Sequence, residues 1–393
     1  MKILSVNAGS SSLKFKLYEM PEEKGLISGV FEKIGLKDSF YTIKTDKEKI
    51  KKEVELKDHE AAFKILMEEL MENGVISSLS EIKGIGHRIV QGGSYFDQSV
   101  EVTEDVIKKI KELSSLAPLH NPAAIVGIKA AQAVIPSARH VTVFDTAFHQ
   151  TIEEENYLYA VPYNWYTDYK VRRYGAHGTS HKYVSLKMNE ILGRYNTKLI
   201  TCHIGNGASI SAVVDGKCIN TSMGLTPNAG LMMGTRCGDI DATIIPYIME
   251  KLNLTPKEVD TFLNKESGLL GISGVSSDSR DIEDGINHGN KRCALAQKMF
   301  VKRIVDYIAK YYVEMEGCDG IVFTAGIGEN SISTRREVLD SLKILGIEID
   351  EEKNNTRGET ICITTDNSSI PCYVIPTDEE LMIARDTYNI VER

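Results

Sequence analysis

Two segments far apart in this chain share one pattern, and this repetition limits the folds open to the chain more than any other feature. Residues 2–18 are predicted to form a strand, a turn of small residues and a second strand. Leu13, Phe15 and Leu17 alternate there with other side chains at the period of two that strands have. Residues 198–217 repeat the order of strand, small-residue turn and strand. Such a repeat predicts a duplicated domain.

The small-residue turns are also candidates for anion binding. The first, at 8–12, contains serine hydroxyls and exposed backbone N–H groups and precedes Lys14, a set that could hold an oxyanion such as phosphate. An ordinary polar hairpin turn explains that stretch equally well. The second turn lies at 205–209, and a third follows a strand at 320–324. Two phosphate-binding turns facing each other across a cleft would suit a nucleotide whose terminal phosphate is transferred.

Length and composition narrow the class of protein. A chain of 393 residues is too long for one ordinary core, so two domains are expected. The net charge of −9 argues against a nucleic-acid partner. No apolar run is long enough for a membrane span, and the start lacks the apolar core of a signal peptide. The seven scattered cysteines suit reduced thiols, which predicts a cytoplasmic protein.

Strands and helices are predicted to alternate along the chain. Further strands are expected at 24–31, 40–44, 82–90, 140–144 and 321–324, and helices at 59–73, 103–115, 122–133, 242–251, 256–264 and 292–316. A last helix is expected to open with a capping box, Thr377-Asp378-Glu379-Glu380. This order predicts an α/β architecture in which helices pack on central sheets.

Several common phosphate-binding motifs are missing. The sequence has no G-x-x-x-x-G-K-[ST], no G-x-G-x-x-G, and no H-R-D or D-F-G set. A P-loop enzyme, a dinucleotide-binding fold and a protein kinase are therefore not expected.

Three charged residues stand where catalytic groups are often found. Arg88 and Arg236 each lie near glycines, where a guanidinium group can approach a phosphoryl group or a carboxylate with two hydrogen bonds. A structural ion pair is the alternative for each arginine. Asp145 follows a buried strand and could orient a nucleophile or bind a metal, although a capping role at the next turn fits equally well.

Three histidines are weaker candidates. His177 and His181 have the i, i+4 spacing of zinc ligands, but no glutamate lies between them and no third ligand is evident, so a hydrogen-bonding or helix-capping role is favoured. His120 lies in a loop bounded by prolines, where a histidine satisfied by local contacts is the simplest interpretation.

A series of segments, in order from one end of the chain to the other, resembles the acetate/propionate/butyrate kinase family. They are residues 6–14, 86–88, 117–122, 144–149, 173–175, 177–181, 203–207, 234–236, 238–241 and 323–330. The resemblance implies duplicated ribonuclease-H-like domains of the actin/hexokinase/Hsp70 superfamily, here expected at 1–147 plus 380–393 and at 148–379. It also implies a homodimer and reversible, Mg²⁺-dependent transfer of a phosphoryl group from ATP to acetate, giving acetyl phosphate and ADP.

The resemblance further implies a role for each matching residue. Catalytic roles fall to Asp145, Arg88, Arg236, His177 and His120. Nucleotide contacts fall to Lys14, Ser10, Ser12, His203, Gly205, Asn206, Gly207, Asp278, Arg280, Gly326, Ile327, Gly328 and Asn330. The acyl group would lie against Arg88, Val90, Leu119, Ala176 and Pro227. Asn7 and Glu379 would hold Mg²⁺, with Mn²⁺ as an alternative.

The chain departs from the family pattern at Ala176, where a phenylalanine that lines the methyl pocket is common. The pocket could be wider here and accept propionate or a broader range of short carboxylates, or a neighbouring side chain could fill the space. Gln91 and Cys237 are peripheral departures. The alternative functions are those of sugar kinases, and of ATP-hydrolysing chaperones and filaments, that have the same fold. A sugar kinase needs an aspartate base for a hydroxyl, and an ATPase that transfers nothing does not need paired arginines.

Overall fold

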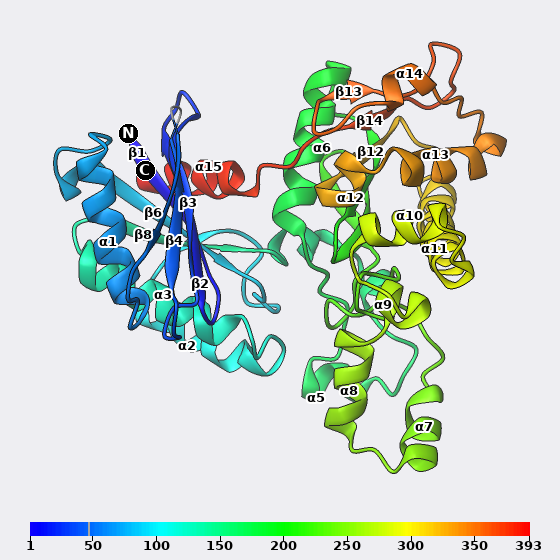
Figure 1. The fold of residues 1–393 in the computed structure, drawn as a ribbon, viewed down its shortest axis with the longest axis horizontal. Helices are drawn as coiled ribbons and strands as arrows, with labels where there is room; N and C mark the ends of the chain where they lie inside the picture. Colours follow the sequence, from blue (N-terminus) through cyan, green and yellow to red (C-terminus); the bar gives the residue numbers. More distant parts are fainter. Residues whose placement is uncertain (46–47) are drawn as a thin grey trace. The chain divides into compact units, whose positions relative to one another are not determined.

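The computed structural model describes residues 1–45 and 48–393, and the chain divides into two units (Figure 1). Unit 1 comprises Met1–Gln150 and Asp378–Arg393, and unit 2 comprises Thr151–Thr377. The chain thus leaves unit 1 once and returns to it at the end. The domain limits expected from the sequence, 147 and 379, lie three and two residues from the observed 150 and 377. Glu379, expected in the second domain, belongs to unit 1.

Unit 1 is built on an eight-stranded sheet with the order β5-β4-β3-β2-β1-β6-β8-β7. Strands β1, β2 and β3 are antiparallel neighbours, whereas β6 runs parallel to β1, and β8 runs parallel to β6. The strands are β1 Lys2–Ala8, β2 Ser12–Glu19, β3 Lys24–Glu32, β4 Phe40–Lys44, β5 Lys49–Glu53, β6 Ile82–Ile89, β7 Val100–Glu101 and β8 Arg139–Phe144.

Helices cover both faces of this sheet. Helices α1 (His59–Glu72) and α3 (Asn121–Val134) pack on one face, where Leu4 and Val6 of β1 join their apolar side chains in one core. Helix α2 (Glu104–Glu112) buries its apolar stripe beside α3. Helix α15 (Glu379–Val391) covers the opposite face so closely that a side chain at Gly86 would collide with it.

Unit 2 repeats this topology in a six-stranded sheet with the order β11-β10-β9-β12-β14-β13. Strands β9, β10 and β11 are antiparallel, β12 runs parallel to β9, and β14 runs parallel to β12. The strands are β9 Lys198–Ile204, β10 Ala208–Val214, β11 Lys217–Thr221, β12 Gly320–Thr324, β13 Ile361–Cys362 and β14 Cys372–Val374. Both units contain three antiparallel strands followed by two parallel ones, which confirms the predicted duplication.

The sheet of unit 2 lies between two long helices. Ile200 and Cys202 of β9 share a core with α11 (Lys291–Glu314), while α6 (Gly178–Leu192) covers the other face. The remaining helices are α4 Glu154–Tyr157, α5 Asn164–Tyr169, α7 Ile244–Leu252, α8 Pro256–Lys265, α9 Gly268–Ser273, α10 Ser279–Asn287, α12 Ala325–Asn330, α13 Ile332–Ser341 and α14 Glu351–Asn354.

Two local predictions were wrong. The third small-residue turn is a short helix, α12, which begins directly after β12. The last helix has no capping box at Thr377. Its N-cap is Asp378, whose carboxylate accepts the backbone N–H of Leu381 at 2.9 Å and also the hydroxyl of Tyr18 at 2.8 Å. Among the described residues, no helix has the length and apolar character needed to cross a membrane.

Candidate active site

The first small-residue turn joins β1 to β2 in unit 1. The backbone N–H of Gly9 donates to the carbonyl of Ser12 at 2.8 Å, and His59 Nε2 lies 2.8 Å from the carbonyl of Gly9. These bonds fix the turn while Ser10 stays exposed. Asn7 lies opposite Lys14 across the hairpin. The Lys14 ammonium group pairs with Glu380 at the start of α15, so the hairpin is also connected to the carboxylates described next.

A cluster of opposite charges lies where β6, β8 and α15 meet. Arg88, near the end of β6, binds Asp145 through two guanidinium nitrogens, with an Nη2–Oδ2 distance of 2.6 Å. The Asp145 side chain is only 2% exposed, so this is a desolvated pair. The negative charges of Asp145, Glu379 and Glu380 raise the pKa of Arg88. Burial, together with the charges of Asp145 and Glu380, raises the pKa of Glu379 although Arg88 opposes that shift.

Asn7 and Glu379 both lie in unit 1. Their amide oxygen and carboxylate are oxygen donors of the kind that Mg²⁺ prefers. A carboxylate whose pKa is raised by burial and by neighbouring carboxylates is also one that a cation would stabilise in its ionised form. Within residues 1–45 and 48–393 no set of three or more His, Cys, Asp or Glu side chains could hold a metal.

Three other predicted residues of unit 1 lie in loops. Val90 directly follows β6 and is half-buried. Leu119 and His120 precede α3 in an exposed loop, and the Leu119 side chain is 68% exposed. A single exposed leucine is common on protein surfaces, so the role of Leu119 in the acyl pocket stays a prediction.

In unit 2, Arg236 lies beside the turn that joins β9 to β10. A side chain at Gly207 would come within 3.2 Å of Arg236 Nη1 and 3.6 Å of His177 Nε2, so both nitrogens line the space in front of this glycine. Arg236 Nη1 donates to the Pro227 carbonyl at 3.3 Å. Among the described residues Arg236 has no carboxylate partner, and burial lowers its pKa. Unlike Arg88, it is a desolvated cation that pairs with no carboxylate in residues 1–45 and 48–393.

The histidines of unit 2 form hydrogen bonds under the first turns of α6. His177 Nδ1 and His181 Nε2 each lie 2.8 Å from Ser209 Oγ, and His181 Nδ1 lies 2.7 Å from Thr201 Oγ1. The His203 ring stacks on that of His177, with centroids 4.0 Å apart. His177 stands at the N-cap position of α6 with a left-handed backbone, φ 60°. The favoured hydrogen-bonding role is thus confirmed for His177 and His181.

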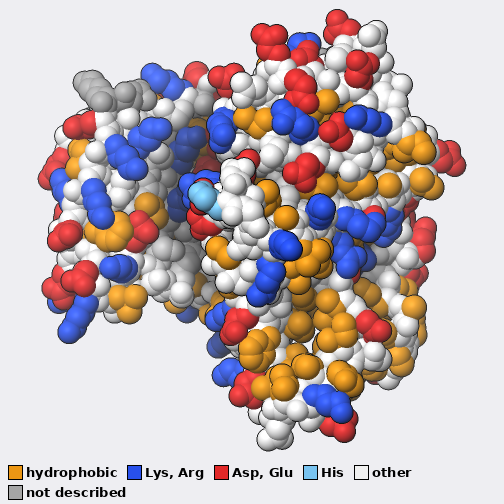
Figure 2. All heavy atoms as spheres, turned by 45° about the vertical axis from the view of Figure 1, so that its right-hand side comes forward, with side chains coloured by type: hydrophobic (Ala, Val, Ile, Leu, Met, Phe, Trp, Pro, Cys, Tyr) orange, Lys and Arg blue, Asp and Glu red, His pale blue; other side chains and the backbone are white. Residues whose placement is uncertain are grey.

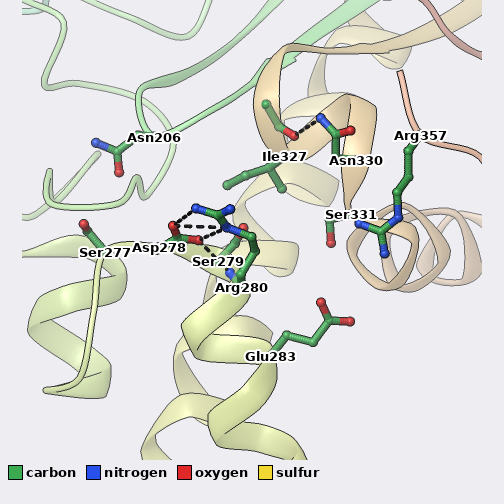
Figure 3. Close-up of a pocket in the computed structure, with 11 residues that line it drawn as sticks. Asn206, Ser277, Asp278, Ser279, Arg280, Glu283, Ile327, Asn330, Ser331 and Arg357 are labelled. Carbon is green, nitrogen blue, oxygen red and sulfur yellow. Dashed lines mark hydrogen bonds and ion pairs between the residues drawn. The ribbon is translucent and has the colours of Figure 1, made fainter. Parts of the chain in front are cut away.

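A pocket of about 570 Å³ lies entirely within unit 2, and Figure 3 shows its walls. Six of its residues were predicted to contact the nucleotide: Asn206, Asp278, Arg280, Gly326, Ile327 and Asn330. The Arg280 guanidinium group pairs with Asp278 on one wall, and its hydrogen bonds lower the pKa of Asp278 to about 2. The pocket is large enough for a nucleoside, and nine of its eleven lining residues have polar side chains.

Sequence reasoning missed the other residues of this pocket. They are Ser277, Ser279, Glu283, Ser331 and Arg357, which surround the predicted ones in the chain or in space. The serines next to Asp278 could have been inferred from the start of α10, but Arg357 lies in a loop after α14 that carries no motif. Gly328, by contrast, is buried, does not line the pocket, and accepts a hydrogen bond from Arg335 Nη1 at 2.9 Å.

The two remaining acyl-pocket candidates belong to unit 2. Pro227 is half-buried in the loop whose carbonyl binds Arg236. Ala176 is 3% exposed and belongs to the same apolar core as Met223, Met232 and Met233. Methionine side chains adapt readily to irregular spaces. The alternative that a neighbouring side chain fills the space beside Ala176 therefore stays open.

Comparison with known proteins agrees with this arrangement. The sequence pattern of the acetokinase family matches residues 2–385. The acetate kinase of Bacillus velezensis is 53% identical over 393 residues, which cover 100% of both chains. Two solved structures, each matched over 99% of both chains, are similar: Porphyromonas gingivalis acetate kinase (46% identity, TM-score 0.95) and a propionate kinase from Francisella tularensis (43%, 0.94). The chain thus belongs to the acetokinase family.

Proposed function

We propose that this protein is an acetate kinase, which reversibly transfers the terminal phosphoryl group of ATP to acetate. The observation that carries the proposal is the contrast between its two arginines. Arg88 is neutralised by Asp145, while Arg236 is a desolvated cation with no carboxylate partner among the described residues. An anion that arrives during the reaction would supply the missing charge. The transferring phosphoryl group is such an anion, and membership of the acetokinase family favours a short carboxylate as its acceptor.

The chemistry requires positioning and charge stabilisation more than a strong base. A short carboxylic acid is already ionised at neutral pH, so its oxygen can attack the phosphorus without giving up a proton. Arg236 Nη1 and His177 Nε2 line the space in front of Gly207 and would bind the transferring phosphoryl oxygens. Arg88 would bind the carboxylate, Asp145 would hold Arg88 in place, and His120 would help to orient the acyl group. Ser10, Ser12, Lys14 and His203 would assist the phosphate contacts.

We propose Mg²⁺ as the cofactor, with Mn²⁺ as an alternative. Asn7 and Glu379 would hold it, the latter as the first residue of α15. When bound, the ion would neutralise charge on the nucleotide phosphates. The raised pKa of Glu379 supports this assignment, because a carboxylate that is costly to ionise alone favours a bound cation.

Propionate is the second candidate substrate, and Ala176 is the observation that favours it. Of the two similar solved structures, the one at 43% identity is named a propionate kinase, whereas the one at 46% and the relative at 53% are named acetate kinases. Val90 opposes a larger substrate, because a β-branched side chain would keep the pocket small. Acetate therefore remains the proposed primary substrate.

The test is to trap the acyl phosphate. Purified protein, ATP and Mg²⁺ are incubated with acetate, propionate or butyrate in the presence of hydroxylamine, and the hydroxamate is measured. We expect product with acetate. The absence of product with all three acids, or strong phosphorylation of a sugar, would refute the proposal.

We also propose a homodimer in the cytoplasm. The cysteines are free thiols in the described structure, as the reducing cytoplasm would keep them. Figure 2 shows hydrophobic side chains gathered over the part of unit 2 where α7 and α8 lie. Helix α7 has no buried residue although its sequence is largely apolar, and Tyr247 and Leu252 are 61% and 60% exposed. A second copy of the chain would cover this surface.

A further inference from the structure

The sheet face beneath α6 carries a row of polar groups that the chemistry above does not use. Thr201 on β9 and Ser209 on β10 are fully buried, and each binds a histidine of the segment 177–181. Together they form one chain of hydrogen bonds: Thr201 Oγ1, His181 Nδ1, His181 Nε2, Ser209 Oγ and His177 Nδ1. The direction in which protons point along this chain follows from counting donors and acceptors.

Thr201 sets the direction at one end. Its hydroxyl is 0% exposed, and within residues 1–45 and 48–393 its one hydrogen-bond partner is His181 Nδ1. A buried hydroxyl proton without an acceptor is costly, so Thr201 must donate to this nitrogen. His181 Nδ1 is then an acceptor, and the neutral ring carries its proton on Nε2.

Ser209 connects His181 to His177 and keeps the same donor-to-acceptor direction. Its hydroxyl is also 0% exposed, and its two partners in the described chain are His181 Nε2 and His177 Nδ1. Since His181 donates from Nε2, Ser209 accepts there and its own proton goes to His177 Nδ1. A doubly protonated His177 would leave the Ser209 proton without an acceptor, so the neutral ring is favoured.

We infer that Thr201, His181 and Ser209 are positioning residues that hold His177 as the neutral tautomer with its proton on Nε2. This nitrogen lines the space in front of Gly207, where Arg236 Nη1 also points. With the opposite tautomer, Nε2 would present a lone pair to an incoming phosphoryl oxygen and repel it. The hydrogen-bond chain thus makes His177 a donor before any substrate arrives. Only this catalytic consequence rests on the proposed function, because the tautomer is a property of the free protein.

The direct test is NMR of the full-length protein with ¹⁵N-labelled histidine, at neutral pH and without substrate. Long-range proton–nitrogen spectra distinguish the two neutral tautomers and the imidazolium form, and loss of signals in His177→Asn assigns the ring. We expect His177 to carry its proton on Nε2. A proton on Nδ1, or an imidazolium ring, would overturn the inference. This result does not depend on which substrate the enzyme uses.

Ser209→Ala tests whether the hydrogen-bond chain is the cause. Without the serine proton, His177 should become a mixture of tautomers. We expect kcat for acyl phosphate formation to fall about tenfold, the effect of one lost hydrogen bond. KM for ATP and for acetate should stay within about twofold, because ground-state binding is unchanged. If His177 in this variant kept the Nε2 proton as fully as the wild type, the chain would not set the tautomer.

Ser211→Ala is the matched control. Ser211 lies two residues along β10 on the same sheet face, is equally buried, and binds Thr221 Oγ1 at 2.9 Å instead of a histidine. The variant removes a hydroxyl from the same strand, at the position paired with Thr201, but breaks no hydrogen bond of the chain. We expect the wild-type tautomer and kcat in this variant. An equal loss of kcat in Ser211→Ala would indicate a general effect of disturbing β10 and would overturn the inference.

Discussion

Arg88 and Arg236 look alike in the sequence but differ in their contacts in the folded protein. Arg88 and Arg236 both stand near glycines, and a single role could be predicted for both. The structure separates them, because Arg88 is bound to a buried carboxylate and Arg236 is not. Only three-dimensional contacts reveal a counter-ion, so this difference was beyond prediction from one sequence.

Replacement of the two arginines by alanine should therefore have different effects on stability. Loss of either group that stabilises transferring charge should lower kcat by about 10²–10³. Arg88→Ala also leaves Asp145 buried without its cation, which should lower the free energy of unfolding by about 3–5 kcal/mol. Arg236→Ala removes an uncompensated buried charge and should keep full stability. Steady-state kinetics and urea unfolding check both; near wild-type turnover in the two variants would show that the arginines are structural.

Replacement by lysine refines this prediction. Lysine keeps the charge but cannot form two parallel hydrogen bonds, so Arg236→Lys should recover only part of kcat. Full recovery would mean that charge alone suffices at this position.

At Ala176 the expected change is in substrate range. One methylene in an apolar pocket changes binding by about 1–3 kcal/mol, which is about 10- to 200-fold. A pocket widened at Ala176 should lie at the low end, so we expect propionate to be used with kcat/KM within about tenfold of acetate. Ala176→Phe should narrow the preference toward acetate. Relative rates of hydroxamate formation measure this. If propionate were strongly rejected by the wild type, and Ala176→Phe had no effect, Ala176 would not line the acyl pocket.

At the scale of elements, sequence patterns located strands and amphipathic helices well. Phe40–Lys44 was predicted with its exact ends, and Pro122 correctly marked the first turn of α3. Helix α6 was not predicted, because polar residues interrupt the apolar side that it buries: Ser180, His181 and Asn189 are all at most 1% exposed and lie among buried apolar residues. An interrupted apolar stripe gives only a weak periodic signal. The same buried side carries the hydrogen-bond chain, so the missed element is a functional one.

The pairing of β6 with β8 predicts a pH dependence of stability. His87 Nε2 and His140 Nδ1 lie 3.0 Å apart across these strands, and burial lowers the pKa of both rings. Below the ordinary value of 6.5 the unfolded chain therefore binds more protons than the folded one. The free energy of unfolding should fall as the pH drops, by up to about 1.4 kcal/mol per pH unit for each histidine.

A double variant, His87→Gln with His140→Gln, checks this expectation. Glutamine can replace the hydrogen bond without titrating, so urea unfolding should show a shallower loss of stability between about pH 7 and pH 5 than in the wild type. Above about pH 7 the two proteins should share one pH dependence. Identical slopes below that pH would show that the histidine pair is not responsible.

For the whole molecule, the sequence predicted the duplicated sheets because each begins with the same hairpin pattern. The sequence could not predict the oligomeric state, because an interface is formed by the surface of the folded protein.

We expect a mass of two chains by light scattering. Tyr247→Asp on α7 should shift the protein toward one chain, because a charge would have to be desolvated in the interface. Ile344→Asp, at a residue 92% exposed, is the control and should leave the mass unchanged. A wild-type protein with the mass of one chain would refute the dimer.

The return of α15 to the first sheet determines the order in which a growing polypeptide can complete its parts. While the ribosome is still adding residues beyond 377, Val141 and Val143 remain bare, because Ile383 has not yet emerged to cover them. Unit 2 has all of its residues before then and can finish folding, although it lies later in the chain. The half of the protein that is synthesised first is thus the last to close. A nascent chain of this kind exposes an apolar sheet face through most of its synthesis, which is the period when chaperones would bind it.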